Sequence, residues 1–255
     1  MIIDTHTHLD DKRFDKDLEE VIQRAREAGV KKMIIPAADP STLKRALKIA
    51  EEFEGIYFAV GVHPYDIHKY FKKFLEHFIT HPKCVAVGEC GLDYYRLPED
   101  KEKAREEKEL QKEIFIEQIE IANRYKKPLI VHIREASRDS QEILEKYAKV
   151  PGVLHCFNAD HQLLNLAKKD FYFGIGGVIT FKNARKLVEV YPKIPQDRLI
   201  IETDSPYLTP HPYRGTRNEP SYCNLIAQKM AQLSNLSKEK IEEITTQNAQ
   251  RLFRI

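Results

Sequence analysis

Eight short apolar runs recur along the chain, and segments with helical periodicity connect many of them. One helix face is predicted by the spacing of Leu18, Val21, Ile22 and Ala25, and Gly29 follows as a helix stop. Alternating strands and helices with short connections predict a parallel sheet with right-handed crossovers, and eight such units suit a closed barrel. We therefore predict an α/β fold, a (β/α)8 TIM barrel, with strands at Met1–His8, Lys32–Ala37, Ile56–Val60, Cys84–Gly88, Leu129–His132, Gly152–His155, Phe171–Gly174 and Leu199–Glu202.

The length of the chain agrees with this fold. A chain of 255 residues is close to the size at which α/β barrels form one domain, about 200–250 residues, and no Gly/Ser-rich or Pro-rich linker divides it. We expect a single domain over residues 1–255. The N-terminus lacks a leader pattern and no long apolar run follows, so we expect a cytoplasmic protein, and a monomer, although the sequence leaves the oligomeric state open.

Charge and cysteine content exclude several kinds of site. The chain has 41 basic and 39 acidic side chains, a formal charge of +2, so no overall field holds it along a polyanion or a membrane. Any nucleic-acid binding must be local. The charged run Glu99–Glu109 mixes both signs, which favours a solvated helix face over a nucleic-acid clamp. Four widely spaced cysteines indicate neither a disulfide framework nor a zinc ribbon.

The first apolar run ends in the triplet His6-Thr7-His8. Side chains alternate along a strand, so His6 and His8 point to the same side, and two neutral imidazoles this close suit a divalent metal ion. A lone His-x-His is often incidental. Its position raises the weight of the metal interpretation, because catalytic residues of parallel barrels collect where strands end.

Other predicted strands end in the same residue types. They supply Glu89, His132, His155 and Asp204. Each has a structural alternative: a hydrogen-bonded core histidine, a salt bridge inside the barrel, or a helix N-cap. Six such residues at one end of a barrel make these alternatives weaker than a shared site. The donors are nitrogen and oxygen only, which suits Zn²⁺, Mn²⁺ or Mg²⁺ and argues against a thiolate site.

Over nearly its whole length, the sequence resembles the TatD-type metal-dependent deoxyribonucleases of the amidohydrolase superfamily. The matching segments are DTHTHLD (Asp4–Asp10), GVHP (Gly61–Pro64), VGECGLDYY (Val87–Tyr95), VHIREA (Val131–Ala136), LHCF (Leu154–Phe157), ETDSPYL (Glu202–Leu208) and PYRGTRNEP (Pro212–Pro220). The resemblance implies a barrel of the metal-dependent hydrolase type with two divalent ions. One ion would be held by His6, His8 and Asp204, the other by His132 and His155, and Glu89 would bridge both. Asn158 departs from the Ser more usual after HCF.

The chemistry of these residues agrees with those roles. A bridging carboxylate such as Glu89 offsets the repulsion of two cations and positions a water activated by both. Asp204 can take or relay a proton. Glu202 could orient a ligand, or form a plain core salt bridge. His63, in Gly-Val-His-Pro, has the place of the family's substrate-facing histidine, although a lone loop histidine often only forms local hydrogen bonds.

Phosphodiester cleavage requires groups that stabilise phosphate oxygens, and the sequence offers several near strand ends. The candidates for substrate binding are His63, Arg134, Arg214 and Arg217. The arginines could instead pair with Asp93, Glu135, Glu219 or another carboxylate. Tyr94 and Tyr95 could stack on bases or pack the loop against the rim. Lys182, Arg185 and Lys186 could extend a phosphate track, but a helix surface is the commoner role, and we leave them out of the site.

The sequence therefore predicts a metal-dependent deoxyribonuclease that shortens a DNA strand from its end. An amidohydrolase or esterase, such as a D-aminoacyl-tRNA deacylase, is the alternative, because the same activated water attacks carbonyl carbon. The three arginines favour phosphate. A barrel that only binds ligands is disfavoured by the full set of ligand candidates. Strand preference, polarity and the physiological metal stay open.

Overall fold

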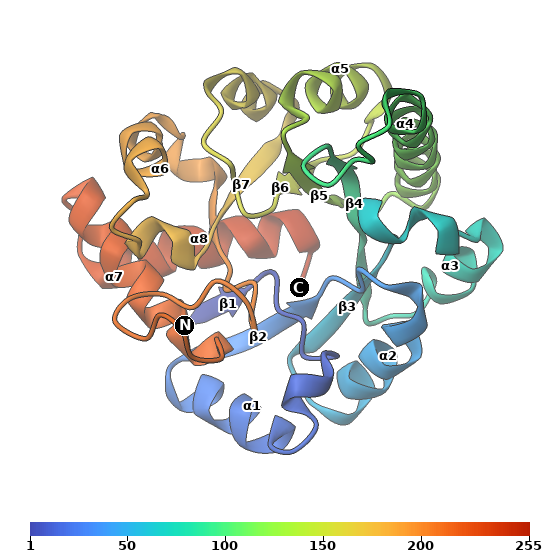
Figure 1. The fold of residues 1–255 in the computed structure, drawn as a ribbon. Helices are drawn as coiled ribbons and strands as arrows, with labels where there is room; N and C mark the ends of the chain where they lie inside the picture. The colour runs from blue at the N-terminus through green and yellow to red at the C-terminus, as the bar shows by residue number, and fades with distance from the viewer.

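The eight strands form one parallel sheet in the order of the chain, and the sheet curls into a nearly closed barrel (Figure 1). The computed structural model describes residues 1–255. The strands are β1 (Ile2–Asp4), β2 (Val30–Ile35), β3 (Ile56–Val60), β4 (Cys84–Asp93), β5 (Leu129–Arg134), β6 (Gly152–Leu154), β7 (Phe171–Ile175) and β8 (Leu199–Ile201). The predicted TIM-barrel architecture is confirmed.

The helices surround this sheet. They are α1 (Leu18–Glu27), α2 (Leu43–Glu52), α3 (Lys72–Phe78), α4 (Lys101–Tyr125), α5 (Ser137–Tyr147), α6 (Arg185–Val190), α7 (Cys223–Ser234) and α8 (Lys238–Phe253). Gly29, at φ +89°, follows α1, as its predicted role as a helix stop requires. None of the helices combines the length and the hydrophobicity needed to cross a lipid bilayer.

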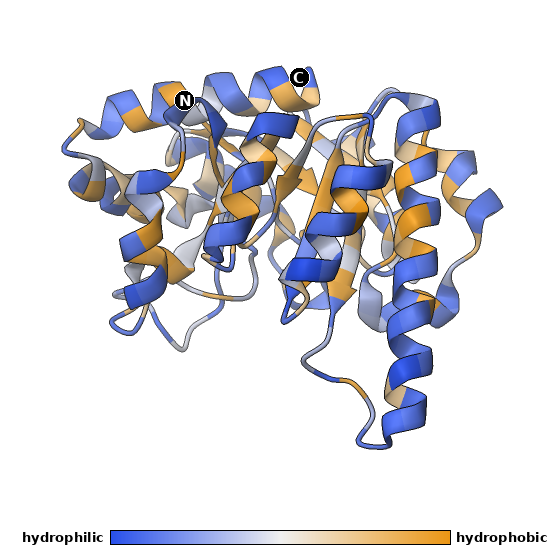
Figure 2. Ribbon diagram, turned by 90° about the horizontal axis from the view of Figure 1, so that it is seen from above, coloured by the Kyte–Doolittle hydropathy of each residue, from blue (hydrophilic) through white to orange (hydrophobic).

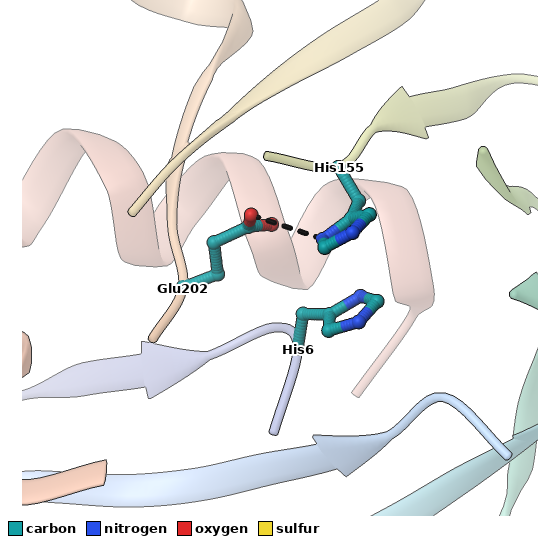
Figure 3. Close-up of side chains that lie close together, drawn as sticks. All are labelled: His6, His155 and Glu202. Atoms are coloured by element: carbon teal, nitrogen blue, oxygen red, sulfur yellow. Dashed lines mark hydrogen bonds and ion pairs between the residues drawn. The ribbon is translucent and has the colours of Figure 1, made fainter. Parts of the chain in front are cut away.

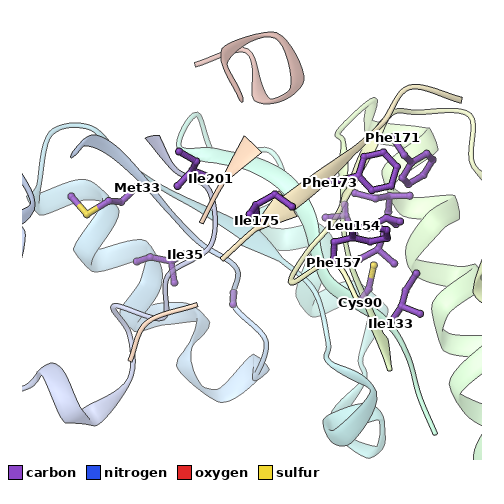
Figure 4. Close-up of a cluster of buried hydrophobic side chains, with 14 of the residues drawn as sticks. Met33, Ile35, Cys90, Ile133, Leu154, Phe157, Phe171, Phe173, Ile175 and Ile201 are labelled. Carbon is purple, nitrogen blue, oxygen red and sulfur yellow. The ribbon is translucent and has the colours of Figure 1, made fainter. Parts of the chain in front are cut away.

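Alternate strand residues face different apolar layers. The larger buried cluster joins residues such as Ile35, Phe173 and Ile201 to the surrounding helices (Figure 4). The smaller cluster contains the residues between them, such as Ile34 and Ile200, together with α8. This second layer fills the barrel interior, and α8 seals that end of it (Figure 1). Figure 2 shows the matching pattern on the helices, whose hydrophobic sides turn toward the sheet.

The barrel closes beyond the regular part of β1. The backbone N–H of Thr5 donates to the carbonyl of Ile201 at 3.1 Å, and that of Asp204 donates to the carbonyl of His6 at 2.8 Å. Thr7 donates to Ile34 of β2 instead, so the chain leaves a regular ladder. Strand β1 therefore ends at Asp4, four residues before the predicted end. The same bonds place His6 beside Asp204.

Strand β4 is longer than predicted. The apolar run predicts a strand over Cys84–Gly88. After an irregularity between Val87 and Cys90, pairing with β5 resumes and continues to Asp93. Gly91 makes this approach possible: it has φ +142°, and a Cβ there would lie 2.0 Å from the carbonyl oxygen of His132.

Helix α4 carries the charged run. Its first turns project past the barrel on the side away from α8 and are predominantly hydrophilic (Figure 2). Ion pairs join Glu102 to Arg105 and Glu109 to Lys112, each three residues apart. Such ion pairs along one helix agree with the solvated helix face that the mixed charges of this run predict.

Candidate metal centre

Six side chains from five strand ends converge at the open end of the barrel. They are His6, His8, Glu89, His132, His155 and Asp204. These are the six metal-ligand candidates predicted from the sequence. They meet because the carboxyl ends of parallel strands lie at the same end of a barrel. The carboxylate of Glu89 lies at the centre of this cluster, and it is buried.

The two carboxylate oxygens of Glu89 face different sets of imidazoles. Its Oε2 lies 3.3 Å from Nε2 of His6 and 4.0 Å from Nε2 of His8. Its Oε1 lies 3.0 Å from Nδ1 of His132 and 3.3 Å from Nε2 of His155. The centre is therefore divided into two halves that share one carboxylate, the arrangement that a bridging ligand of two cations requires.

Asp204 belongs to the first half. Its Oδ1 lies 3.3 Å from Nε2 of His8 and 3.7 Å from Nε2 of His6. Burial opposes ionisation of Asp204, but a hydrogen bond from His8 and nearby positive charge outweigh it, so the pKa of Asp204 falls below its ordinary value. The carboxylate is ionised at neutral pH and can both ligate a cation and accept a proton.

The second half has carboxylate partners behind its imidazoles. Nε2 of His132 lies 2.9 Å from Oδ2 of Asp93, and Nδ1 of His155 lies 3.2 Å from Oε1 of Glu202 (Figure 3). A histidine that donates one ring N–H to a carboxylate presents its other nitrogen as a lone pair. In both rings the nitrogen that faces Glu89 is therefore the one left to ligate a cation, because the other nitrogen is held by Asp93 or Glu202.

Glu202 reaches this position because β7 leaves room for it. A Cβ at Gly174 would lie 2.2 Å from Oε2 of Glu202. The same carboxylate accepts the backbone N–H of Cys156 at 2.5 Å. The sequence left two roles open for Glu202, orienting a ligand or forming a core salt bridge. Its contacts favour the first role, since it bonds to His155 and no lysine or arginine pairs with it.

His6 provides the test of whether these residues fit a metal ion. Its ring is completely buried and stacks on that of His155 at a centroid distance of 3.6 Å (Figure 3). Neither of its ring nitrogens forms a hydrogen bond. A buried polar atom without a partner costs about 1–3 kcal/mol, so the fold tolerates a defect here that a bound cation would repair.

His63 lies beside the second half but is oriented differently. Its Nδ1 accepts the backbone N–H of Tyr65 at 3.0 Å, so the neutral ring carries its proton on Nε2, which lies 3.5 Å from Oε1 of Glu89. Burial lowers the pKa of His63 to about 3, so the ring stays neutral. His63 is therefore a hydrogen-bond donor facing the centre, a role that suits substrate and not a metal ion.

The three candidate arginines differ in what they contact. Arg217 donates to both oxygens of Asp17, at 2.7 and 2.6 Å, and to Glu219 at 2.8 Å. This is the carboxylate pairing that the sequence left open as the alternative. It occupies the guanidinium with contacts inside the protein. Arg214 donates to the carbonyl of Thr209 and lies over the ring of Phe181. Arg134 is exposed and has no carboxylate partner.

The two neighbouring tyrosines also separate. The hydroxyl of Tyr94 donates to Asp139 at 2.8 Å, so this ring packs the loop against the rim. Tyr95 is 53% exposed, and the guanidinium of Arg134 lies over its ring, 3.6 Å from the ring centroid. Of the pair, only Tyr95 offers a free face to a ligand.

Asp93 is the contributor that the sequence reasoning assigned no role in the centre. From the sequence it is only a possible ion-pair partner of Arg134, and it lies beyond the predicted end of the strand at Gly88. The available signal was the spacing of Glu89, Gly91 and Asp93, whose period of two is that of one strand face.

We expect Asp93→Asn to weaken metal binding about 10- to 100-fold, the usual effect of removing a carboxylate behind a ligating histidine. The amide can present either its oxygen or its NH2 group to His132, so it no longer selects one tautomer. Titration of the metal-free protein against a competing chelator measures the affinity. Asp139→Asn is the matched control, because Asp139 pairs with Tyr94 and Lys112 on the same rim. Equal affinities in the two variants would contradict the role of Asp93.

Comparison with known proteins identifies the family. The sequence model of the TatD-related DNases matches residues 3–254. The chain belongs to this family. It is 43% identical to the Bacillus subtilis (strain 168) protein named uncharacterized metal-dependent hydrolase YabD, over 100% of both chains. It is 32% identical to the 3′-5′ ssDNA/RNA exonuclease TatD of Edwardsiella piscicida, again over 100% of both.

A solved structure supports the same assignment. The TatD homologue YjjV of Escherichia coli K12 superposes with a TM-score of 0.90 at 30% sequence identity, covering 100% of this chain and 98% of that one. The protein is thus a metal-dependent hydrolase of the TatD family, as its strand-end residues indicated.

Proposed function

We propose that the protein hydrolyses phosphodiester bonds of single-stranded DNA from a strand end, with two divalent ions held in the two halves of the centre. His6, His8 and Asp204 would hold one ion, His132 and His155 the other, and Glu89 both. The observation that carries this proposal is the division of the Glu89 oxygens between the two sets of imidazoles. Two bound ions would activate water and offset the charge that phosphate gains.

The remaining chemistry belongs to side chains of the chain itself. Asp204 is ionised and open to the site, so it accepts the proton that the attacking water loses. His63 donates from Nε2 to a phosphate oxygen, and its neutrality keeps that proton in place. Asp93 and Glu202 keep His132 and His155 in one tautomer.

Support for a nucleic-acid substrate comes from the rim next to His63 and His132. Two exposed tyrosines, Tyr65 and Tyr95, lie against the guanidinium groups of Arg96 and Arg134. Neither arginine has a carboxylate partner, so both charges are available to phosphate. Aromatic rings beside arginines bind single strands by stacking, with little sequence preference. The exonuclease TatD of Edwardsiella piscicida, whose name specifies single-stranded DNA and RNA, is consistent with this.

The direct test is cleavage of end-labelled single- and double-stranded DNA by protein reconstituted with Zn²⁺, Mn²⁺ or Mg²⁺, with an aminoacyl-tRNA as a parallel substrate. We expect mononucleotides to appear from one end of the single strand, and chelation to stop the reaction. Deacylation of the aminoacyl-tRNA without DNA cleavage would contradict the proposal and support the carbonyl-directed hydrolase.

We expect Arg134→Lys to lower kcat/KM on single-stranded DNA by up to about 10²-fold, because an ammonium cannot form two parallel bonds to phosphate or stack equally on Tyr95. Arg217→Lys should leave cleavage near the wild-type rate, since Arg217 is used by Asp17 and Glu219. It should instead lower the melting temperature by a few degrees, the shift that about 1 kcal/mol produces in a protein of this size.

This pair of variants tests the sequence-based expectation that Arg134 and Arg217 both bind the substrate. Steady-state kinetics and thermal unfolding on the same preparations decide it. Normal cleavage by Arg134→Lys, or a loss confined to Arg217→Lys, would show that the rim near β5 does not bind the substrate.

A further inference from the structure

A cavity of about 260 Å³ lies next to the metal centre, between the segments that follow β6 and β7 and helix α6. Its walls include Phe157, Asn158, Val178, Asn183, Lys186 and Leu187. The volume is slightly below the roughly 300–1,000 Å³ of pockets for drug-sized ligands, so it suits one small ring system and not a longer segment of chain. Apolar surface with a few polar groups at its edge is the usual composition of such a pocket.

The inner wall of this cavity adjoins the metal centre. Cys156 and Gly174 line it. Cys156 directly follows His155, and both residues lie against the carboxylate of Glu202. A ligand in the cavity therefore lies beside the half of the centre that contains His155. On the β3–β5 side of the same centre lie the exposed tyrosines Tyr65 and Tyr95, so the metal centre lies between the cavity and this rim.

The polar groups at the edge of the cavity are free. The side chains of Asn183 and Lys186 form no hydrogen bond or ion pair within the protein, and neither do those of Lys182 and Arg185 next to them. Lys186 lines the cavity, and Lys182 and Arg185 are its neighbours in the sequence, so three cations without carboxylate partners give this segment a local positive charge, although the whole chain is close to neutral. Such a field selects a ligand that joins an apolar ring to a phosphate.

We propose that this cavity binds the terminal nucleoside of the DNA strand, with its base against Phe157, Val178 and Leu187, Asn183 at the base edge, and Lys186 at the phosphate. The proposal rests on the function proposed above and adds the site that limits cleavage to the end. A pocket of the size of one nucleoside on one side of the centre, with an exposed rim on the other, would release one nucleotide at a time.

The test combines a pocket variant with a substrate that lacks the terminal base. Val178→Phe fills the cavity, and Val188→Phe, which adds the same ring on α6 outside the cavity lining, is the control. The substrates are two single-stranded oligonucleotides that differ only in whether the nucleotide at the cleaved end carries its base. Loss of the base should lower wild-type kcat/KM about 5- to 150-fold, the factor that one stacked base contributes.

Val178→Phe should lower cleavage of the normal oligonucleotide by a similar factor and barely affect the one without its terminal base, whereas Val188→Phe should behave as wild type on both. Equal cleavage of the two oligonucleotides by the wild type would overturn the proposal. So would equal losses on both substrates in Val178→Phe. If thermal unfolding shows that Val178→Phe is not folded, Asn183→Ala against Asn165→Ala provides the same comparison at exposed positions, because Asn183 is placed at the base edge and Asn165 lies outside the cavity lining.

A binding measurement separates this proposal from the proposed function. Deoxynucleoside 5′-monophosphate is titrated into metal-free protein, where no turnover occurs, and binding is followed by NMR. Binding that Val178→Phe abolishes and Val188→Phe retains supports the pocket even if the protein fails to cleave DNA. Binding that is unchanged in Val178→Phe, or absent in the wild type, would overturn the pocket while leaving DNA cleavage as a separate question.

Discussion

Asp204→Asn is expected to keep the fold and to lose nearly all turnover, by about 10²–10⁴-fold. The amide is nearly isosteric with the carboxylate, so the backbone bond from Asp204 to the carbonyl of His6 can persist. It cannot accept the proton released by water, and it is a poorer ligand for a cation than the carboxylate that faces His6 and His8. Both losses act in the same half of the centre.

Single-turnover cleavage of end-labelled DNA, beside elemental analysis of the same sample, measures the two effects separately. Asp197→Asn is a suitable control, because Asp197 is a surface carboxylate paired only with Arg198. A variant at Asp204 that combines full metal occupancy with the wild-type kcat would show that the proton leaves through bulk solvent and that Asp204 is not the base.

Glu89→Gln is expected to reduce the metal content from two equivalents toward one and to lower activity at least as much. In the protein the charge of Glu89 is strongly favoured: burial opposes it, but the surrounding histidines outweigh burial and hold the pKa of Glu89 well below its usual range. A neutral amide has one oxygen instead of two equivalent ones and cannot offset two cations lying ~3.5–4 Å apart.

Metal-reconstituted wild-type protein and Glu89→Gln are compared by elemental analysis after removal of free ions. The control is Glu202→Gln, in which the carboxylate behind His155 changes while the shared one remains. We expect that variant to lose affinity without losing one whole equivalent. A wild-type protein that saturates at one equivalent would contradict the binuclear centre and favour a single catalytic ion.

Much of the fold and the centre could be predicted from the sequence because both depend on local pattern. Apolar runs of strand length, separated by helical periodicity, specify a parallel barrel, since short connections leave few other ways to bury them. In such a barrel the end of each strand reaches the same rim. His6, Glu89, His132, His155 and Asp204 could therefore be grouped from their positions alone, and the structure brings them together.

Local pattern was misleading where glycines interrupt a strand. Gly88 and Gly91 break the apolar run of β4, so the continuation of the strand to Asp93 was missed, and with it the partner of His132. Whether a glycine ends a strand or allows a neighbouring strand to approach depends on the other chain segment. For Gly91 that segment is the backbone of His132, 41 positions further along the sequence.

The sequence by itself thus determined the barrel and the set of metal-ligand candidates, because strand periodicity and strand ends are local properties. Only the tertiary structure decided which charges are free. Arg134 and Arg217 look alike in the sequence, yet Arg217 meets Asp17 from 200 positions away while Arg134 lies over Tyr95. The pocket beside His155 likewise joins segments after β6 and β7 with α6. Ion pairs and cavities form between segments distant in the chain, and no local spacing encodes those distances.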